Sequence, residues 1–196
     1  MKQDYDFFHR RFIRIEDDFL EILDFIDVSG DFNDPCYKVG SPKLMDFCLK
    51  VGTEVETLFR QILKSSRFDS LPNISKKRSK QNIHVYKEVI EPVYKLSEYR
   101  LLVNLIDIEI TPFENFDTQT PEWFKIYSPG KHNKTELLGK WNLRHSIYSL
   151  GCLLILVINH PSLDDKEFRI HRVSQRVFDL LDSRPKFGGV NISINF

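Results

Sequence analysis

The chain has 196 residues, of which 41% are hydrophobic, and its 28 basic and 28 acidic side chains cancel. This much apolar material can build the core of one domain, so the composition excludes a disordered protein. Because the net charge is zero, no overall field attracts nucleic acid or an anionic membrane, and any such contact must come from a local patch.

Cysteine usage and the apolar runs bear on the cellular location. Three cysteines, an odd number without close metal-type pairs, favour a reducing cytoplasm. The N-terminal residues carry charges where a signal peptide needs an apolar segment, so no export is expected. The longest apolar run, Ile147–Ile158, is shorter than the roughly 20 residues of a spanning helix. We expect a cytoplasmic protein without membrane contact, metal or other cofactor.

Two amphipathic helices are predicted near the N-terminus. Apolar residues recur in steps of four and three from Phe8 to Ile26, which is the repeat of a helix with one buried face. A second helix is predicted over about Pro42–Lys64, with an N-cap at Ser41 and proline at its first position. Gly52 lies on its apolar stripe, where the missing side chain would let a neighbouring helix approach closely. The stripe comprises Leu44, Met45, Cys48, Gly52, Val55, Phe59 and Ile62.

The middle of the chain combines a predicted loop, a short helix and a strand. Residues 65–81 are polar and basic without a helical period, which predicts a surface loop. Asn82–Glu91 is a predicted short helix that Pro92 ends or kinks. The alternating segments Leu105–Ile110 and Val190–Phe196 predict strands. Because a lone strand leaves its backbone unsatisfied, we expect these two to pair in a small sheet.

Three more helices are predicted in the last third. A short helix opens at Thr120–Glu122 and breaks at Ser128–Gly130, and a long one runs from about Lys134 to Asn159. The second half of the long helix is apolar nearly all round, which is typical of the central helix of a bundle. A last amphipathic helix is predicted over Lys166–Leu181. The predicted fold class is therefore mainly α (α+β), a helical bundle with a small two- or three-stranded sheet, in a single domain over residues 1–196.

The pair Lys131-His132 lies between the predicted short and long helices, beside Tyr127. Because histidine titrates near neutral pH, the pair could serve in acid–base chemistry or phosphate binding. The alternative is a turn whose side chains cap the preceding helix, and spacing alone favours this alternative.

Glu56 lies at the edge of the apolar stripe, whereas Glu54 falls on the predicted wet face. A carboxylate at such an edge needs a cationic partner to offset its desolvation, and the Lys131-His132 turn or Arg144 could supply one. A structural salt bridge is favoured over a catalytic role.

Two further groups combine basic or titratable side chains. His145 shares a helical stripe with apolar residues, so we expect it to face a neighbouring element, and a core or interface role is favoured over catalysis. The dense basic cluster is Lys76, Lys77, Arg78 and Lys80, which could hold phosphates, although such runs are usually solvated.

Gly-rich phosphate loops, GxSxG, paired CxxC and HExxH are all absent from the sequence. NTPase, serine hydrolase and zinc chemistry therefore have no basis in these motifs.

The segment YSPGKHNK (residues 127–134) resembles a motif of HEPN-like, abortive-infection-type bacterial helical proteins. In that group W-W-x-x-Y-N is followed by x-x-K-H-x-R and a long apolar helix. GTEVETLFRQIL is similar to the group's E-I-E-x-L-F-K segment, with Glu54 and Glu56 in the acidic positions. The resemblance spans about residues 10–160, with Ser128 in place of Asn and Lys134 in place of Arg. The matching motif residues are Trp123, Tyr127, Lys131 and His132.

The resemblance implies a function on RNA. HEPN proteins are helical bundles, often dimeric, and many are metal-independent ribonucleases of toxin–antitoxin and phage-defence systems. Their usual signature is Arg followed by His after four to six residues, and the only such spacing here is Arg78 to His84, away from the turn. The implied partners are RNA and a second copy or another protein. The implied catalytic residues are His132, Lys131 and Glu56, and the implied substrate-binding residues are Lys134, Tyr127, Arg78 and Lys77.

Two readings without catalysis remain open. In one, the protein is a helical interaction protein whose residues Lys131, His132 and Glu56 only hold helices together. In the other, it is an antitoxin-like or regulatory subunit whose basic loop meets an acidic partner.

Overall fold

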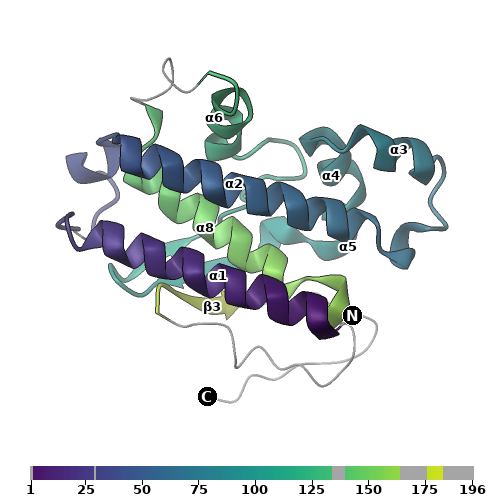
Figure 1. Cartoon of the computed structure of the whole chain (residues 1–196), viewed down its shortest axis with the longest axis horizontal. Coiled ribbons are helices and arrows are strands. Elements are labelled where there is room, and N and C mark those ends of the chain that lie inside the picture. Colours follow the sequence, from purple (N-terminus) through teal and green to yellow (C-terminus); the bar gives the residue numbers. More distant parts are fainter. Residues whose placement is uncertain (1, 29, 134–139, 164–175, 183–196) are drawn as a thin grey trace.

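A computed structural model describes residues 2–28, 30–133, 140–163 and 176–182. This part of the chain is mainly helical and carries a small antiparallel sheet of three strands, as predicted. Figure 1 shows α1 (Lys2–Leu23) and α2 (Pro42–Leu63) across the front, with α8 (Leu143–Ile158) behind them. Among the helices described, none is both long and apolar enough to cross a membrane.

The two predicted N-terminal helices are confirmed. α1 buries the repeat from Phe8 to Ile22 against the core. α2 begins where expected, because Ser41 Oγ accepts a hydrogen bond from the Leu44 amide at 3.1 Å and Pro42 occupies the first turn. Every residue of its predicted apolar stripe is buried. The hydrophobic period alone therefore predicted which face of each helix enters the core.

α8 is the central helix, and its apolar residues are buried on nearly all sides by α1, α2 and α6 (Glu122–Gly130). Gly151 lets it lie against the sheet and the chain after it, since a Cβ there would come within 3.2 Å of Leu101 Cδ1 and 2.8 Å of Pro112 Cγ. The predicted start near Lys134 is wrong in the described part, because Asn142 is extended and caps the helix by accepting from the His145 amide at 2.9 Å. Residues 134–139 lie outside the described ranges.

The sheet has the order β2-β1-β3, with β1 (Arg100–Val103) paired to β2 (Ile108–Ile110) and β3 (Phe178–Asp182). Leu101 lies opposite Ile110 on one side and Leu180 on the other. The predicted strand from Leu105 is confirmed only from Ile108, because the chain turns at residues 104–107. β1 was not predicted, since four residues of sequence RLLV carry no clear alternation.

The predicted last helix is wrong over residues 178–181, which form most of β3. Pairing with β1 satisfies the backbone there and buries Phe178, so tertiary contacts override a helical pattern. Residues 164–175 of that predicted helix are outside the described part. The predicted strand Val190–Phe196 and its pairing also fall outside it. The described neighbour of β2 is β1.

The predicted loop over residues 65–81 is largely helical, in η2 (Ser66–Phe68) and α3 (Ile74–Lys80). Phe68 and Ile74 are buried and anchor it to the core. Arg78 also ties α3 to the end of α2, since its Nε donates to the Leu63 carbonyl at 2.9 Å. The basic composition of residues 65–81 gave no indication of these two apolar anchors or of the structural role of Arg78.

The remaining short elements follow in chain order. The predicted short helix consists of α4 (Ile83–Val89) and α5 (Glu91–Tyr94), which meet at the expected kink before Pro92. α6 continues through Ser128 and Pro129 and ends at Gly130, so the predicted break over Ser128–Gly130 is correct only at its last residue. Proline removes only one helical hydrogen bond, and the burial of α6 side chains holds its last turn. Single turns of 3-10 helix lie at η1 (Pro35–Lys38), η3 (Leu96–Glu98) and η5 (Pro161–Leu163).

Candidate functional site

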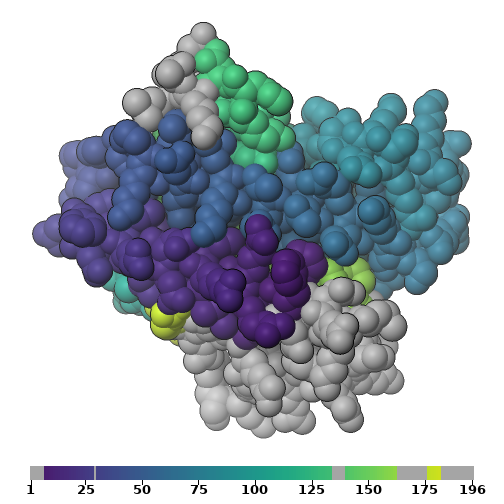
Figure 2. All heavy atoms as spheres, viewed as in Figure 1, coloured from purple at the N-terminus to yellow at the C-terminus, as the bar shows by residue number. Residues whose placement is uncertain are grey.

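The turn after α6 meets the middle of α2 in a charged cluster. Lys131 Nζ donates to Glu56 Oε1 at 2.6 Å and lies 4.8 Å from the centroid of the Tyr127 ring. The Glu56 and Lys131 side chains are only 24% and 30% exposed, so their ion pair is partly shielded from water. Glu56 thus has the lysine partner that its position at the stripe edge requires. In the space-filling view, the end of α6 projects beside α2 (Figure 2).

Gly52 makes this contact between α2 and α6 possible. A Cβ at position 52 would lie 2.3 Å from Tyr127 Cδ2, so only glycine leaves room for the ring. The predicted close approach of a neighbouring helix at Gly52 is therefore confirmed. Burial raises the pKa of Tyr127 to about 12, with the nearby Glu56 charge acting in the same direction. The phenol stays protonated at neutral pH and serves as a packing surface for Lys131.

His132 follows Lys131 and is exposed to solvent. Its backbone amide donates to the Pro129 carbonyl at 3.0 Å, and this hydrogen bond closes the turn that follows α6. An exposed imidazole beside a fixed ion pair is accessible to a ligand. His132 is thus placed by the backbone of the turn, whereas Lys131 is placed by side-chain contacts.

The other predicted substrate-binding residues lie elsewhere. Lys77 Nζ forms an ion pair with Glu88 Oε1 at 2.9 Å, and Arg78 Nη2 contacts Asp69 Oδ1 at 2.8 Å. Both belong to α3, which lies at one end of the molecule in Figure 1, away from α6. Lys134 is outside the described residues. The structure therefore brings Glu56, Tyr127, Lys131 and His132 together but keeps Lys77 and Arg78 apart from them.

Two charged residues near the cluster have roles other than those predicted. Glu54 is buried rather than on the wet face, and Arg11 Nη2 lies 2.5 Å from its Oε1. Arg144 does not serve Glu56, because its guanidinium lies over the rings of Phe32 and Tyr148. A helical wheel of α2 alone could not reveal that α1 covers the Glu54 face.

His145 is buried beneath a surface hollow of about 510 Å³ beside α6. Its Nδ1 lies 2.9 Å from the Lys140 carbonyl, and its Nε2 lies 4.0 Å from Glu122 Oε1. Burial lowers the pKa of His145, so the ring is neutral at pH 7 and donates from Nδ1 to the carbonyl. The expected orientation toward a neighbouring element is confirmed.

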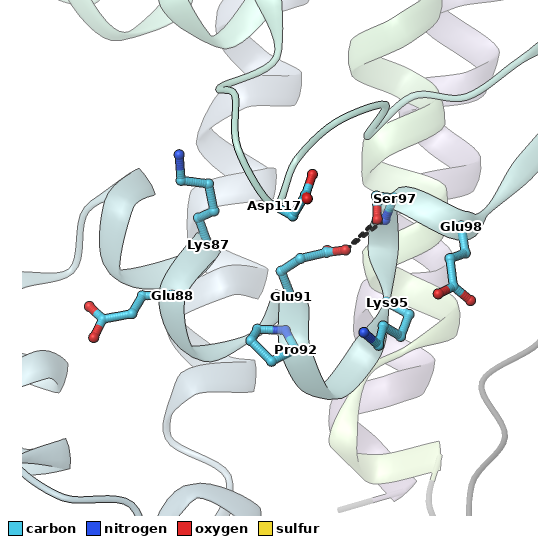
Figure 3. Close-up of a pocket in the computed structure, with 8 residues that line it drawn as sticks. All are labelled: Lys87, Glu88, Glu91, Pro92, Lys95, Ser97, Glu98 and Asp117. Atoms are coloured by element: carbon cyan, nitrogen blue, oxygen red, sulfur yellow. Dashed lines mark hydrogen bonds between the residues drawn. The ribbon is translucent and has the colours of Figure 1, made fainter.

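A second hollow, of about 590 Å³, is lined in part by Glu91, whose carboxylate is buried (Figure 3). Ser97 donates to Glu91 Oε1 from its amide at 3.2 Å and from its hydroxyl at 2.5 Å. Burial raises the pKa of Glu91 above its ordinary value of 4.5, and the Asp117 charge adds to this effect. Sequence reasoning missed this site because a glutamate in the first turn of a helix is common and gives no sign of burial.

Within the described ranges, His, Cys, Asp and Glu side chains form no group of three that could hold a metal ion. Comparison with known proteins finds no family model, curated protein or solved structure that matches the chain.

Proposed function

We propose that the protein is an HEPN-like, RNA-directed factor of bacterial defence or toxin type that cleaves RNA without a metal at the turn after α6. One observation carries the proposal. The two segments that resemble the HEPN-like motifs are separated by 75 residues at Glu56 and Lys131, yet these side chains form a 2.6 Å ion pair next to exposed His132. The proposal includes a cytoplasmic location and a second copy or another protein as partner.

In the proposed reaction, His132 takes the proton from a ribose 2′-hydroxyl. The 2′-oxygen then bonds to phosphorus while the bond from phosphorus to the 5′-oxygen breaks. The 5′-oxygen takes a proton from water, and the His132 imidazolium returns its proton to the resulting hydroxide. The products are a 2′,3′-cyclic phosphate and a 5′-hydroxyl. Lys131 stabilises the developing negative charge on the phosphate, and Glu56 and Tyr127 hold its ammonium group in position.

The test compares wild type with His132→Ala. On expression in bacteria, we expect growth arrest and fragmented total RNA with wild type, and neither with the variant. His84→Ala tests the alternative site given by the Arg78-His84 spacing, because His84 is also exposed but lies in α4, and a loss of activity in this variant alone would contradict the assignment to the turn. Both variants should keep the wild-type melting temperature, since neither histidine is in the core.

The assay with purified protein removes any dependence on a cellular trigger. A labelled RNA that stays intact with purified wild type, or that is cut equally by His132→Ala, contradicts the proposal.

A second candidate is a non-catalytic interaction protein, and the state of Lys131 favours it. Its ammonium is already engaged by Glu56 and by the Tyr127 ring, as in a contact that holds α6 on α2. Exposed apolar side chains, including Phe25 and Val39, offer surface for a partner. Intact RNA with purified wild type would favour this candidate. The alternative of an antitoxin-like subunit whose basic loop meets an acidic partner has less support, because Lys77 and Arg78 are held in ion pairs.

A further inference from the structure

We propose that the hollow at Glu91 binds a small organic cation through its primary ammonium group. The hollow is formed by α4, α5, η3 and the chain after β2, and its volume of about 590 Å³ suits a small molecule. This site is separate from the turn after α6 and does not depend on the function proposed there. Its lining residues are Lys87, Glu88, Glu91, Pro92, Lys95, Ser97, Glu98 and Asp117.

The proposal rests on Glu91, because only one of its two carboxylate oxygens has a hydrogen-bond partner. The residue is 4% exposed, and both hydrogen bonds from Ser97 reach Oε1. Oε2 is buried without a hydrogen-bond partner in the described part of the chain. A buried carboxylate oxygen in this state costs free energy unless a donor or cation reaches it.

The charges around Glu91 favour a cation as that partner. The Glu91 side chain extends toward Ser97 and passes beside Asp117 in Figure 3. The two carboxylates repel each other, since the Asp117 charge helps to raise the pKa of Glu91. A positive group between them would remove this repulsion and supply the missing donor.

The other charged lining residues do not fill this role. Lys87 Nζ donates to the Thr118 carbonyl at 2.8 Å, and Glu88 is paired with Lys77. Lys95 is exposed and makes no hydrogen bond with Oε2. Glu98 adds a further carboxylate to the rim. The lining therefore has more carboxylates than lysines, and neither lysine neutralises Glu91.

An organic ammonium fits this lining better than a metal ion. The acids of the hollow do not form a described group of three that could hold a metal. Pro92 and the aliphatic stems of two lysines offer apolar contact for a short carbon chain. Because Oε2 is buried, the residues that cover it must move for the ammonium to reach it.

The experiment is isothermal titration calorimetry of the full chain with putrescine and spermidine at low ionic strength. We expect binding to wild type, and a loss of about 10-fold or more in affinity for Glu91→Gln, the usual value of a hydrogen bond to a charged group. Asp117→Asn should also weaken binding, and it keeps the test valid if Glu91→Gln does not fold. Glu88→Gln is the matched control, since Glu88 lines the same hollow but is engaged by Lys77.

Several results would overturn the proposal. The first is that wild type does not bind the diamine, and the second is that Glu91→Gln and Asp117→Asn both bind it as tightly as wild type does. The third is that Glu88→Gln loses as much affinity as Glu91→Gln, which would indicate only general attraction by surface acids. Magnesium or calcium binding with the same dependence on Glu91 would assign the site to a metal instead. Retained diamine binding by His132→Ala would show that the two sites are independent.

Discussion

At the residue scale, two buried titratable side chains differ in how completely they are satisfied. His145 is neutral and hydrogen-bonded to the Lys140 carbonyl, so burial and protonation state agree. Glu91 keeps one oxygen without a described partner, so burial and charge are in conflict. Titratable groups whose pKa is perturbed by burial and by a neighbouring charge cluster at functional sites, and this is the reason for testing the hollow at Glu91.

This conflict predicts a pH dependence of stability. The pKa of Glu91 is raised in the folded state, so the folded protein binds the proton more tightly than the unfolded chain does. The contribution of Glu91 to stability is therefore fully present below pH 4.5 and is lost as the pH rises through the folded-state pKa. Glu91→Gln should lack this loss, so its free energy of unfolding should fall less than that of wild type as the pH rises from 4 to 8.

Urea unfolding of both proteins between pH 4 and 8 measures this difference. A difference in stability that stays constant over this range would contradict the inferred titration of Glu91.

At the element scale, the α2–α6 contact depends on the absence of a side chain at Gly52. Glycine to alanine inside a helix normally stabilises by about 1 kcal/mol. Here the new Cβ would lie 2.3 Å from Tyr127 Cδ2, so we expect Gly52→Ala to destabilise by about 2 kcal/mol instead. Denaturant unfolding measures the change.

A double variant shows whether the Tyr127 ring is the cause. With Tyr127→Leu in place, Gly52→Ala should cost much less than in wild type. The pair Gln61→Gly and Gln61→Ala, at an exposed position of the same helix, is the control for helix propensity alone. A stabilising effect of Gly52→Ala would mean that α6 does not pack on α2 in this way.

At the scale of the whole molecule, Glu16 joins α1 to the start of β3. The residue is fully buried, and its carboxylate accepts from Arg176 Nη2 at 3.1 Å and from the Val177 amide at 3.2 Å. Removing it leaves the buried Val177 amide without its acceptor. Glu16→Ala should therefore lower the free energy of unfolding by about 2 kcal/mol.

Asp17 provides a matched control because it pairs with the same arginine, 2.7 Å from Arg176 Nη1, but is half exposed. Asp17→Ala should cost less than about 0.5 kcal/mol, the usual value of a surface ion pair. Equal losses for Glu16→Ala and Asp17→Ala would show that the Val177 amide contributes little. Thermal unfolding at one pH is sufficient for this comparison.

Local patterns in the sequence accounted for the long helices and part of the candidate site. The period of apolar residues predicted the buried faces of α1 and α2, because a helix brings residues three and four apart onto one side. The Ser41-Pro42 cap and the need of Glu56 for a cation are also local or nearly local properties. The same reasoning could not choose between Lys131 and Arg144 as the partner of Glu56.

The fold class, the helical faces, the close approach at Gly52 and the central place of α8 could be predicted from the amino acids alone, because each depends on side chains within a few helical turns. Three features became apparent only in the folded molecule: residues 178–181 form a strand, the basic segment contains α3, and Glu91 is buried. Each of these depends on partners distant in the chain, such as β1 for β3 and Leu63 for Arg78. Backbone polar groups and charged side chains need hydrogen-bond or ion-pair partners in the folded molecule, and the neighbouring residues in the sequence do not specify which partners these will be.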